Sequence, residues 1–159
     1  MNKIKSWEAL AQICGKARQQ SKKIVFTNGC FDILHEGHML LLQKAKQLGD
    51  ILIVGLNTDS SVKRLKGSSR PINTEQERAQ NLATLDFVGY VTLFEQDTPL
   101  ELITAIKPDV LVKGGDYANK NCVGSQFVES LGGKTVIIPL VEGVSTTKII
   151  EKLGLKSKV

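Results

Sequence analysis

The 159-residue sequence has few cysteines, few aromatic residues and no long apolar run. Its three cysteines, Cys14, Cys30 and Cys122, form no CxxC pair, which argues against a disulfide framework and fits a reducing compartment. Aromatic residues make up 5% of the chain and are not interleaved with basic runs, so we expect no nucleic-acid partner. No window reaches the roughly 18 apolar residues of a membrane span, and residues 1–10 have no apolar signal core. We therefore expect a cytoplasmic protein with no membrane partner.

Two nucleotide-binding fingerprints are also missing. The sequence contains neither the GxGxxG of dinucleotide-binding folds nor the GxxxxGK[ST] of P-loop proteins. What remains is an ordinary globular composition, with 42% hydrophobic residues, 23% charged residues and a net charge of +5. This excess of positive charge suits a polyanionic ligand. Because stacking rings are scarce, we expect that ligand to be a small phosphorylated molecule.

The order of the patterns predicts an α/β fold. Short apolar runs rich in β-branched residues alternate with helical patterns, as expected for strands buried on both faces of a parallel sheet. We expect one domain over residues 1–159, with a Rossmann-like, doubly wound, parallel five-stranded sheet and helices on both faces. An N-terminal helix within residues 1–20 packs on it. The expected strands lie near residues 23–27, 51–57, 88–94, 110–113 and 135–139.

Several helix starts are marked by capping residues. They are Ser6, the capping box of Thr74 with Glu77, a second box of Thr98 with Glu101 that has Pro99 at the first helical position, and Ser145 before a helix at residues 146–153. The segment of residues 63–71 is basic, rich in Gly and Ser, and too polar to pack. We expect a mobile loop there.

The tetrapeptide His35-Glu36-Gly37-His38 contains both histidines of the chain and opens the amphipathic stretch of residues 39–48. A helix start offers free N–H groups and the positive end of the helix dipole. Two imidazoles three residues apart can hydrogen-bond one oxyanion, and Gly37 leaves room for its close approach. The pattern favours a phosphate site. Two alternatives stay open, namely a metal site with Cys30 and Asp32 as further ligands, and a solvated helix start without chemistry.

Other polar segments follow the expected strands, and ligands of doubly wound sheets bind beyond the carboxyl ends of the strands. These segments are Thr27 to Asp32, Asn57 to Asp59, Lys113 to Asp116 and Gly143 to Thr147. We expect them to cluster at one edge of the sheet.

Three basic residues are further candidates. Lys63 and Lys66 could neutralise a triphosphate if their loop closes on it. Arg78 lies in the first turn of its helix, where a cation opposes the dipole, so it indicates an anionic partner unless it pairs with Glu75 or Asp86.

Together these residues resemble a known family. A strand, a TNGxFD-like turn, HxGH, a basic segment before an ER helix and a final G-[IV]-S-T-T helix start are similar to the HxGH nucleotidyltransferases. Within that superfamily the chain most resembles the adenylyltransferase domains that make ADP-heptose from D-glycero-β-D-manno-heptose 1-phosphate for lipopolysaccharide. The resemblance runs from about Ser6 to the end. Leu140-Val141 replace the R-T pair of the related cytidylyltransferases, which weakens the alternative of CMP transfer to glycerol 3-phosphate or another small phosphate.

The resemblance implies in-line attack of a sugar 1-phosphate on the α-phosphorus of ATP, with Mg²⁺ bound mainly to the triphosphate and no metal ligand from the protein. The implied catalytic residues are His35, His38, Lys66 and Arg78. The implied nucleotide contacts are Thr27, Asn28, Gly29, Cys30, Phe31, Gly37, Ser145, Thr146 and Thr147, and the implied substrate contacts are Asp32, Lys63, Lys113, Gly114 and Asp116. A separate heptose kinase chain would supply the sugar phosphate. The oligomeric state is left open, with a homodimer as the commonest closed assembly. The alternative from another class is a regulatory module that binds nucleotide without turnover.

Overall fold

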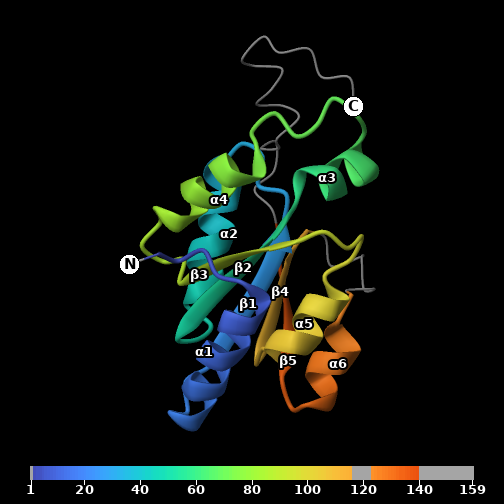
Figure 1. Ribbon diagram of the computed structural model, residues 1–159. Helices are drawn as coiled ribbons and strands as arrows, with labels where there is room; N and C mark the ends of the chain where they lie inside the picture. Colours follow the sequence, from blue (N-terminus) through green and yellow to red (C-terminus); the bar gives the residue numbers. More distant parts are fainter. Residues whose placement is uncertain (1, 116–122, 140–159) are drawn as a thin grey trace.

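The computed structural model describes residues 2–115 and 123–139 (Figure 1). Five parallel strands form one sheet in the order β3-β2-β1-β4-β5. The strands are β1 (Ile24–Gly29), β2 (Ile51–Asn57), β3 (Tyr90–Phe94), β4 (Val110–Gly114) and β5 (Lys134–Ile138). The chain order reverses between β1 and β4, which is the switch point of a doubly wound sheet. The predicted fold class is confirmed.

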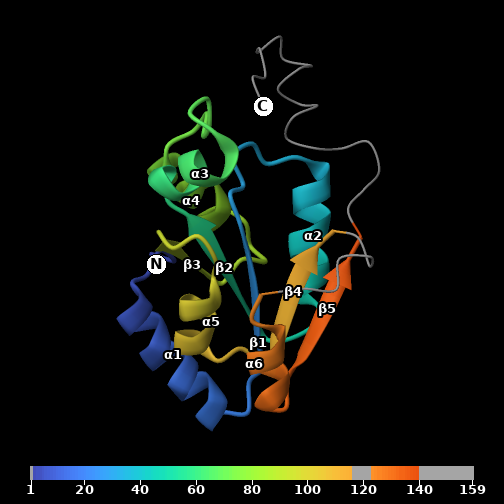
Figure 2. The same ribbon diagram turned by 90° about the vertical axis from the view of Figure 1, so that its right-hand side faces the viewer.

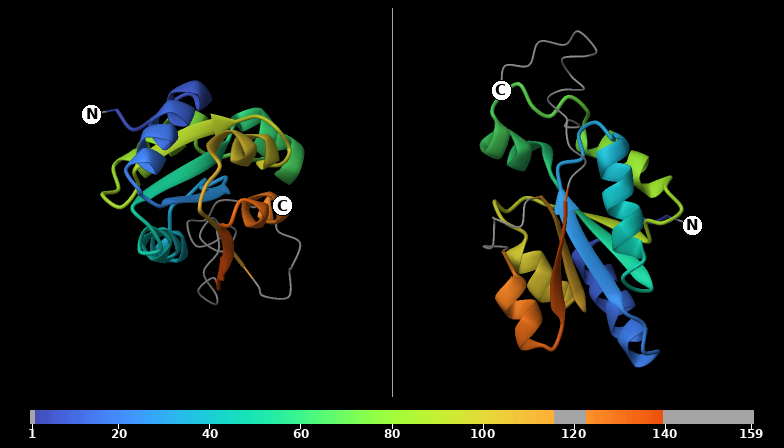
Figure 3. Two further views of the ribbon diagram at one scale, coloured as in Figure 1. Left: turned by 90° about the horizontal axis from the view of Figure 1, so that it is seen from below. Right: turned by 180° about the vertical axis from the view of Figure 1, so that it is seen from behind.

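Helices cover both faces of this sheet. They are α1 (Trp7–Gln19), α2 (Glu36–Lys46), α3 (Asp59–Lys66), α4 (Glu75–Ala83), α5 (Leu100–Ile106) and α6 (Ser125–Ser130). Apolar residues of α2 and α4 pack on one face of the sheet, and those of α1, α5 and α6 pack on the other. The end-on view shows α1 and α2 on opposite sides of the strands (Figure 3).

Alternation along the strands explains the two cores. In β1, Ile24 and Phe26 join the core with α1, whereas Val25 points to the core with α2. Gly55 in β2 allows close packing, because a Cβ there would lie 2.7 Å from Phe26 Cζ and 3.0 Å from Leu102 Cδ2. The central strands are therefore buried on both sides, as their continuous apolar runs predict.

Two of the predicted helix starts are confirmed. The Ser6 hydroxyl caps α1 by accepting from the Ala9 N–H at 3.2 Å. At α4 the Thr74 hydroxyl accepts from the Glu77 N–H at 3.2 Å, and the Glu77 carboxylate accepts from the Thr74 N–H at 3.1 Å. This is the reciprocal arrangement of a capping box.

The second predicted capping box is wrong. Helix α5 starts one residue later than expected, with Pro99 as its N-cap. With Pro99 as the N-cap, the third helical position is Leu102, so Glu101 is out of register for the reciprocal bond, and proline has no side-chain acceptor to cap the helix. The Glu101 carboxylate instead accepts from the Gln96 side chain, and the Thr98 hydroxyl accepts from the Leu100 N–H at 3.4 Å.

The loop predicted at residues 63–71 is helical in its first four residues and irregular from residue 67 on. Residues 63–66 form the last turn of α3, which is capped by the Thr58 hydroxyl and anchored by the buried Val62. Farther along, Arg70 is only 4% exposed. Residues 63–69 are exposed, as their polar composition predicts, and the basic last turn of α3 suits the negative end of its dipole.

The carboxyl ends of the parallel strands meet at one edge of the molecule. In Figure 2 the arrowheads of β4 and β5 point towards the end where α3 and the first turn of α2 lie. The helix predicted at residues 146–153 lies outside the described residues. Within residues 2–115 and 123–139, no helix combines the length and the apolar character that a membrane crossing requires.

Candidate active site

His35 is the N-cap of α2, and its ring replaces the usual hydroxyl or carboxylate cap. Its Nδ1 accepts from the backbone N–H of Gly37 at 3.0 Å and from that of His38 at 3.4 Å. An acceptor nitrogen carries no hydrogen, so the neutral ring is protonated at Nε2. Burial lowers the pKa of His35, which favours this neutral form. The ring thus has an N–H donor that capping leaves free.

His38 has the opposite arrangement. Its Nδ1 lies 3.1 Å from the carbonyl oxygen of Ile33, which can only accept, so Nδ1 carries the hydrogen and Nε2 keeps a lone pair. Burial chiefly, and then the neighbouring His35 and Lys66, lower the pKa of His38 to about 4, despite the bond to Ile33. The ring is therefore neutral at pH 7 in the free protein.

The two rings stack on one another at the start of α2. Their centroids are 3.8 Å apart with an interplanar angle of 21°, and the ring of Phe31 meets His38 edge-on at 5.1 Å. Lys66, at the end of α3, contributes its positive charge to the same place. Lys63 lies one turn earlier on α3 and is exposed. The structure thus brings one lysine of the predicted basic segment, Lys66, close enough to the histidine pair for its charge to act on His38.

The buried Arg78 connects four segments around the site. Its guanidinium donates to the carbonyl oxygens of Cys30 (2.9 Å), Asn57 (2.8 Å) and Asn73 (3.1 Å), and to the Asp59 carboxylate (2.7 Å). These acceptors come from the loop after β1, the end of β2, the segment before α4 and the start of α3.

The structure corrects both sequence-based interpretations of Arg78. Its ion-pair partner is Asp59, not Glu75 or Asp86. Its side chain is 0% exposed, so it has no atom with which to touch a phosphate. In the structure all its contacts are internal ones that join these segments, and its implied catalytic role stays a prediction.

Asp32 is likewise an internal anchor. It is 2% exposed, forms an ion pair with Arg70 at 3.2 Å, and accepts from the backbone N–H of Ile72 (2.8 Å) and of Asn73 (2.9 Å). These three bonds engage both carboxylate oxygens and hold the segment before α4 against the loop before α2. The implied direct contact of Asp32 with the substrate does not fit this environment.

No metal-binding group of three or more His, Cys, Asp or Glu occurs among the residues that the structure describes. The alternative in which Cys30 and Asp32 join the two histidines around a metal is therefore contradicted. Cys30 instead approaches the Asn57 side-chain oxygen with its Sγ at 3.8 Å. Burial raises the pKa of its thiol, against the lowering effect of nearby cations, of which Lys66 is the strongest.

The turn after β1 is tightly packed. Thr27 is buried and its hydroxyl donates to the Val112 carbonyl at 3.0 Å, so it joins β1 to β4 and is not exposed for the implied nucleotide contact. At Gly29 a Cβ would lie 2.9 Å from Cε2 of Phe31, and Phe31 itself has a positive φ of 45°. The close approach of that ring explains why glycine is needed at this turn.

A cavity of about 220 Å³ lies at the switch point of the sheet. Its lining comes from the ends of β1, β2, β3 and β4 and from segments near them: Asn28, Asn57, Leu65, Phe94, Asp97, Thr98, Pro99, Lys113 and Val123. The predicted residues Asn28 and Lys113 thus face one space, joined by Asn57. Amide and ammonium groups beside apolar walls can bind a polar ligand with hydroxyl groups.

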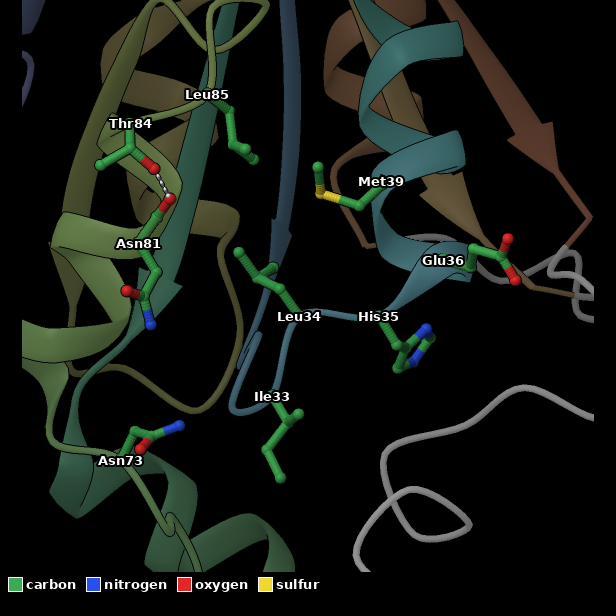
Figure 4. A pocket seen from close by; sticks show the side chains of 9 residues that line it. All are labelled: Ile33, Leu34, His35, Glu36, Met39, Asn73, Asn81, Thr84 and Leu85. Carbon is green, nitrogen blue, oxygen red and sulfur yellow. Dashed lines mark hydrogen bonds between the residues drawn. The ribbon is translucent and has the colours of Figure 1, made fainter. Parts of the chain in front are cut away.

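A second, more open cavity of about 550 Å³ lies between α2 and α4. Figure 4 shows His35, Glu36 and Met39 on one side of it, Asn81, Thr84 and Leu85 on the other, and Ile33 and Leu34 between them. His35 thus lies where this cavity borders the start of α2.

Residues 26–152 match the family model described as cytidylyltransferase-like. The chain belongs to this cytidylyltransferase-like family. The predicted resemblance to nucleotidyltransferases is confirmed, and the domain is an enzyme domain of that class.

Close relatives of this cytidylyltransferase-like domain carry the name "Bifunctional protein HldE". The chain is 57% identical over 152 residues to the protein from Trichlorobacter lovleyi and 52% identical over 151 residues to that from Geobacter sulfurreducens. These matches cover 96% and 95% of this chain but 31% of each relative, so the chain spans about a third of their length.

Two solved structures are also similar. A lipopolysaccharide core biosynthesis protein from Thermoplasma volcanium is 29% identical, with a TM-score of 0.62 over 76% of this chain and 97% of that one. A pantoate-β-alanine ligase from Francisella tularensis, 19% identical, has a TM-score of 0.69 over 99% of this chain and 74% of its own. The second likeness shows the fold alone.

Sequence patterns missed the role of three residues in this cytidylyltransferase-like domain. Arg70, Asn73 and Asp59 hold the site together through contacts with residues far away in the chain. For Asp59 a signal existed, because it lies in the polar segment that follows β2. β4 ends at Gly114, one residue beyond the strand predicted for residues 110–113. The predicted site residues Asp116, Ser145, Thr146 and Thr147 lie outside the described residues.

Proposed function

We propose that the domain transfers AMP from ATP to D-glycero-β-D-manno-heptose 1-phosphate, giving ADP-heptose and pyrophosphate for the lipopolysaccharide inner core. The observation that carries this proposal is the stacked histidine pair at the start of α2, where an anion is already favoured. The resemblance to ADP-heptose-forming domains supports heptose 1-phosphate as the acceptor. So does the 29% identity to a protein described as a lipopolysaccharide core biosynthesis protein.

In this proposal the sugar phosphate oxygen attacks the α-phosphorus, and the bond from that phosphorus to the pyrophosphate oxygen breaks. The Nε2–H of His35 donates to an α-phosphate oxygen, where it stabilises charge as the transition state forms. Lys66 and Lys63 balance the β- and γ-phosphates. Mg²⁺ bound to the triphosphate would supply further charge neutralisation beside the two lysines.

The remaining contacts are part of the same proposal. Asn28, Gly29, Cys30, Phe31 and Gly37 surround the phosphates and nucleoside from the β1–α2 side, while Lys113 and Gly114 contact the substrate at the end of β4. Asp116 and residues 145–147 complete the site from outside the described residues.

The decisive experiment is pyrophosphate release measured across a grid of ATP and CTP against heptose 1-phosphate and glycerol 3-phosphate. We expect turnover with ATP and the heptose phosphate to exceed every other combination. His38→Ala should lower that turnover by roughly a hundredfold, by analogy with loss of an oxyanion donor. Equal or faster turnover with CTP would replace the proposal with the cytidylyl alternative that the family name also suits.

The cellular setting is proposed with it. The free thiols of Cys14 and Cys30 suit the reducing cytoplasm, where ATP is available. A kinase must supply the sugar 1-phosphate, and we propose a separate chain for it. The relatives' name "bifunctional" suits a second activity in the part of their length that this chain does not match. A homodimer, the commonest closed assembly, is our proposal for the oligomeric state.

A further inference from the structure

The two stacked histidines offer different atoms to a ligand. His35 uses Nδ1 to accept from two backbone N–H groups, which leaves Nε2–H as a donor. His38 uses Nδ1–H to donate to Ile33, which leaves a lone pair on Nε2. A phosphate oxygen also carries only lone pairs, so it is attracted to the first ring and repelled by the second.

We infer that an oxyanion binds to both rings only with the uptake of one proton at Nε2 of His38, while His35 stays neutral as a fixed donor. The inference rests on the proposed function in taking a nucleoside triphosphate as the anion. The proton comes from solvent and remains on Nε2 as a hydrogen-bond donor. It returns to solvent when the product leaves, and no bond forms between histidine and phosphorus.

The surroundings of His38 favour the uptake of only one proton by the pair of rings. The imidazole of His35 lies 3.8 Å away and Lys66 adds positive charge from α3, so a second cation beside it is disfavoured. Phe31 and Ile33 contribute only a ring edge and a carbonyl. Asp32, in the same loop, is already paired with Arg70.

The low pKa of the buried ring agrees with this geometry. A His38 that is neutral at pH 7 in the free protein must change its protonation state before it can donate to phosphate. Protonating His35 instead would release both N–H groups that it caps. The cost of an uncapped helix start keeps the proton on the other ring.

Imidazole ¹⁵N NMR tests the assignment directly. In the free protein at pH 7.5 we expect His35 protonated at Nε2 and His38 at Nδ1. Saturation with α,β-methylene-ATP and Mg²⁺ should protonate both nitrogens of His38 and leave His35 unchanged. The reverse tautomers, or a His38 that stays neutral when saturated, would overturn the inference.

Calorimetric titration in buffers of different ionisation enthalpy counts the protons. At pH 7.5 the wild type should take up close to one proton per nucleotide, and His38→Gln close to none. His35→Asn keeps a capping acceptor but loses the Nε2–H donor, so it should weaken nucleotide binding while each nucleotide that binds still brings close to one proton to His38. Nucleotide binding without proton uptake would refute the inference and leave the proposed function standing. Absence of nucleotide binding would count against the proposed function, and the same titration with inorganic pyrophosphate would then decide the inference.

Discussion

Replacing Arg78 by methionine separates a positioning role from direct catalysis. The substitution keeps an unbranched side chain of similar length and removes all the guanidinium donors. Because Arg78 is fully buried, water cannot readily replace those donors for the carbonyls of Cys30, Asn57 and Asn73. The Asp59 carboxylate would also lose its partner at 2.7 Å.

The expected loss of stability follows from these contacts. Removing one partner of a buried ion pair costs about 3–5 kcal/mol, and a buried carbonyl without a donor costs about 1–3 kcal/mol. Asp59 is 33% exposed, so water recovers part of its solvation, and local relaxation relieves some of the carbonyls. We therefore expect Arg78→Met to lower the free energy of unfolding by about 4 kcal/mol. Arg78→Lys keeps the charge but cannot reach every acceptor, so it should lose about half as much.

Urea unfolding followed by the fluorescence of Trp7, the single tryptophan, measures the loss. The matched control is Lys63→Met, which removes an exposed cation from α3 and should change stability by less than about 0.5 kcal/mol. If Arg78→Met unfolds like the wild type yet has no turnover, the guanidinium acts on the substrate itself and the positioning role is refuted.

Four further outcomes are expected. His35→Ala removes the cap of α2 and should cost about 1 kcal/mol in urea unfolding, whereas His35→Asn should stay near the wild type; equal losses would argue against the cap. His38 has a folded pKa of about 4 against an ordinary 6.5, so the unfolded chain binds its proton first. The stability should therefore fall as the pH drops from 6.5 to 4, by at most about 3 kcal/mol, and His38→Gln should flatten that slope in thermal melts. Asp32→Ala leaves Arg70 buried without its carboxylate and should cost about 3–5 kcal/mol in urea; a loss below 1 kcal/mol would contradict the anchor. Gly55→Ala forces a methyl group into a packed core and should lower the free energy of unfolding by about 1–3 kcal/mol. Calorimetry measures this as a lower melting temperature, and an unchanged melting temperature would contradict the close packing.

The fold could be predicted because its signals are local. Continuous apolar runs marked the strands to within about two residues, as for residues 51–57, which the structure bears out, and residues 88–94, where β3 begins at Tyr90. The capping box of Thr74 and Glu77 is formed by residues three apart in the chain. The box expected at Thr98 and Glu101 is not formed because the helix begins one residue later, which puts Glu101 out of register with the N-cap.

The interior of the site could not be predicted in the same way. Asp32 and Arg70 are 38 residues apart, and Arg78 and Asp59 are 19 apart, so no helical or strand periodicity relates them. The sequence showed charged residues near a phosphate motif, and the simplest interpretation was contact with phosphate. The burial of Asp32, Arg70 and Arg78 favours another interpretation, because these charges are bonded to other parts of the protein and hold the loops of the site in place.

The choice of histidine at position 35 is explained by its second nitrogen. A cap alone would be better supplied by Ser, Asn or Asp, which accept from the same N–H groups at less steric cost. Only an imidazole can accept at the cap with one atom and donate into the site with another. Because the cap occupies Nδ1, the direction of the ring and the position of its hydrogen are fixed before any ligand arrives. A donor fixed in this way needs no reorganisation as charge develops on a phosphate oxygen, which is what electrostatic catalysis requires.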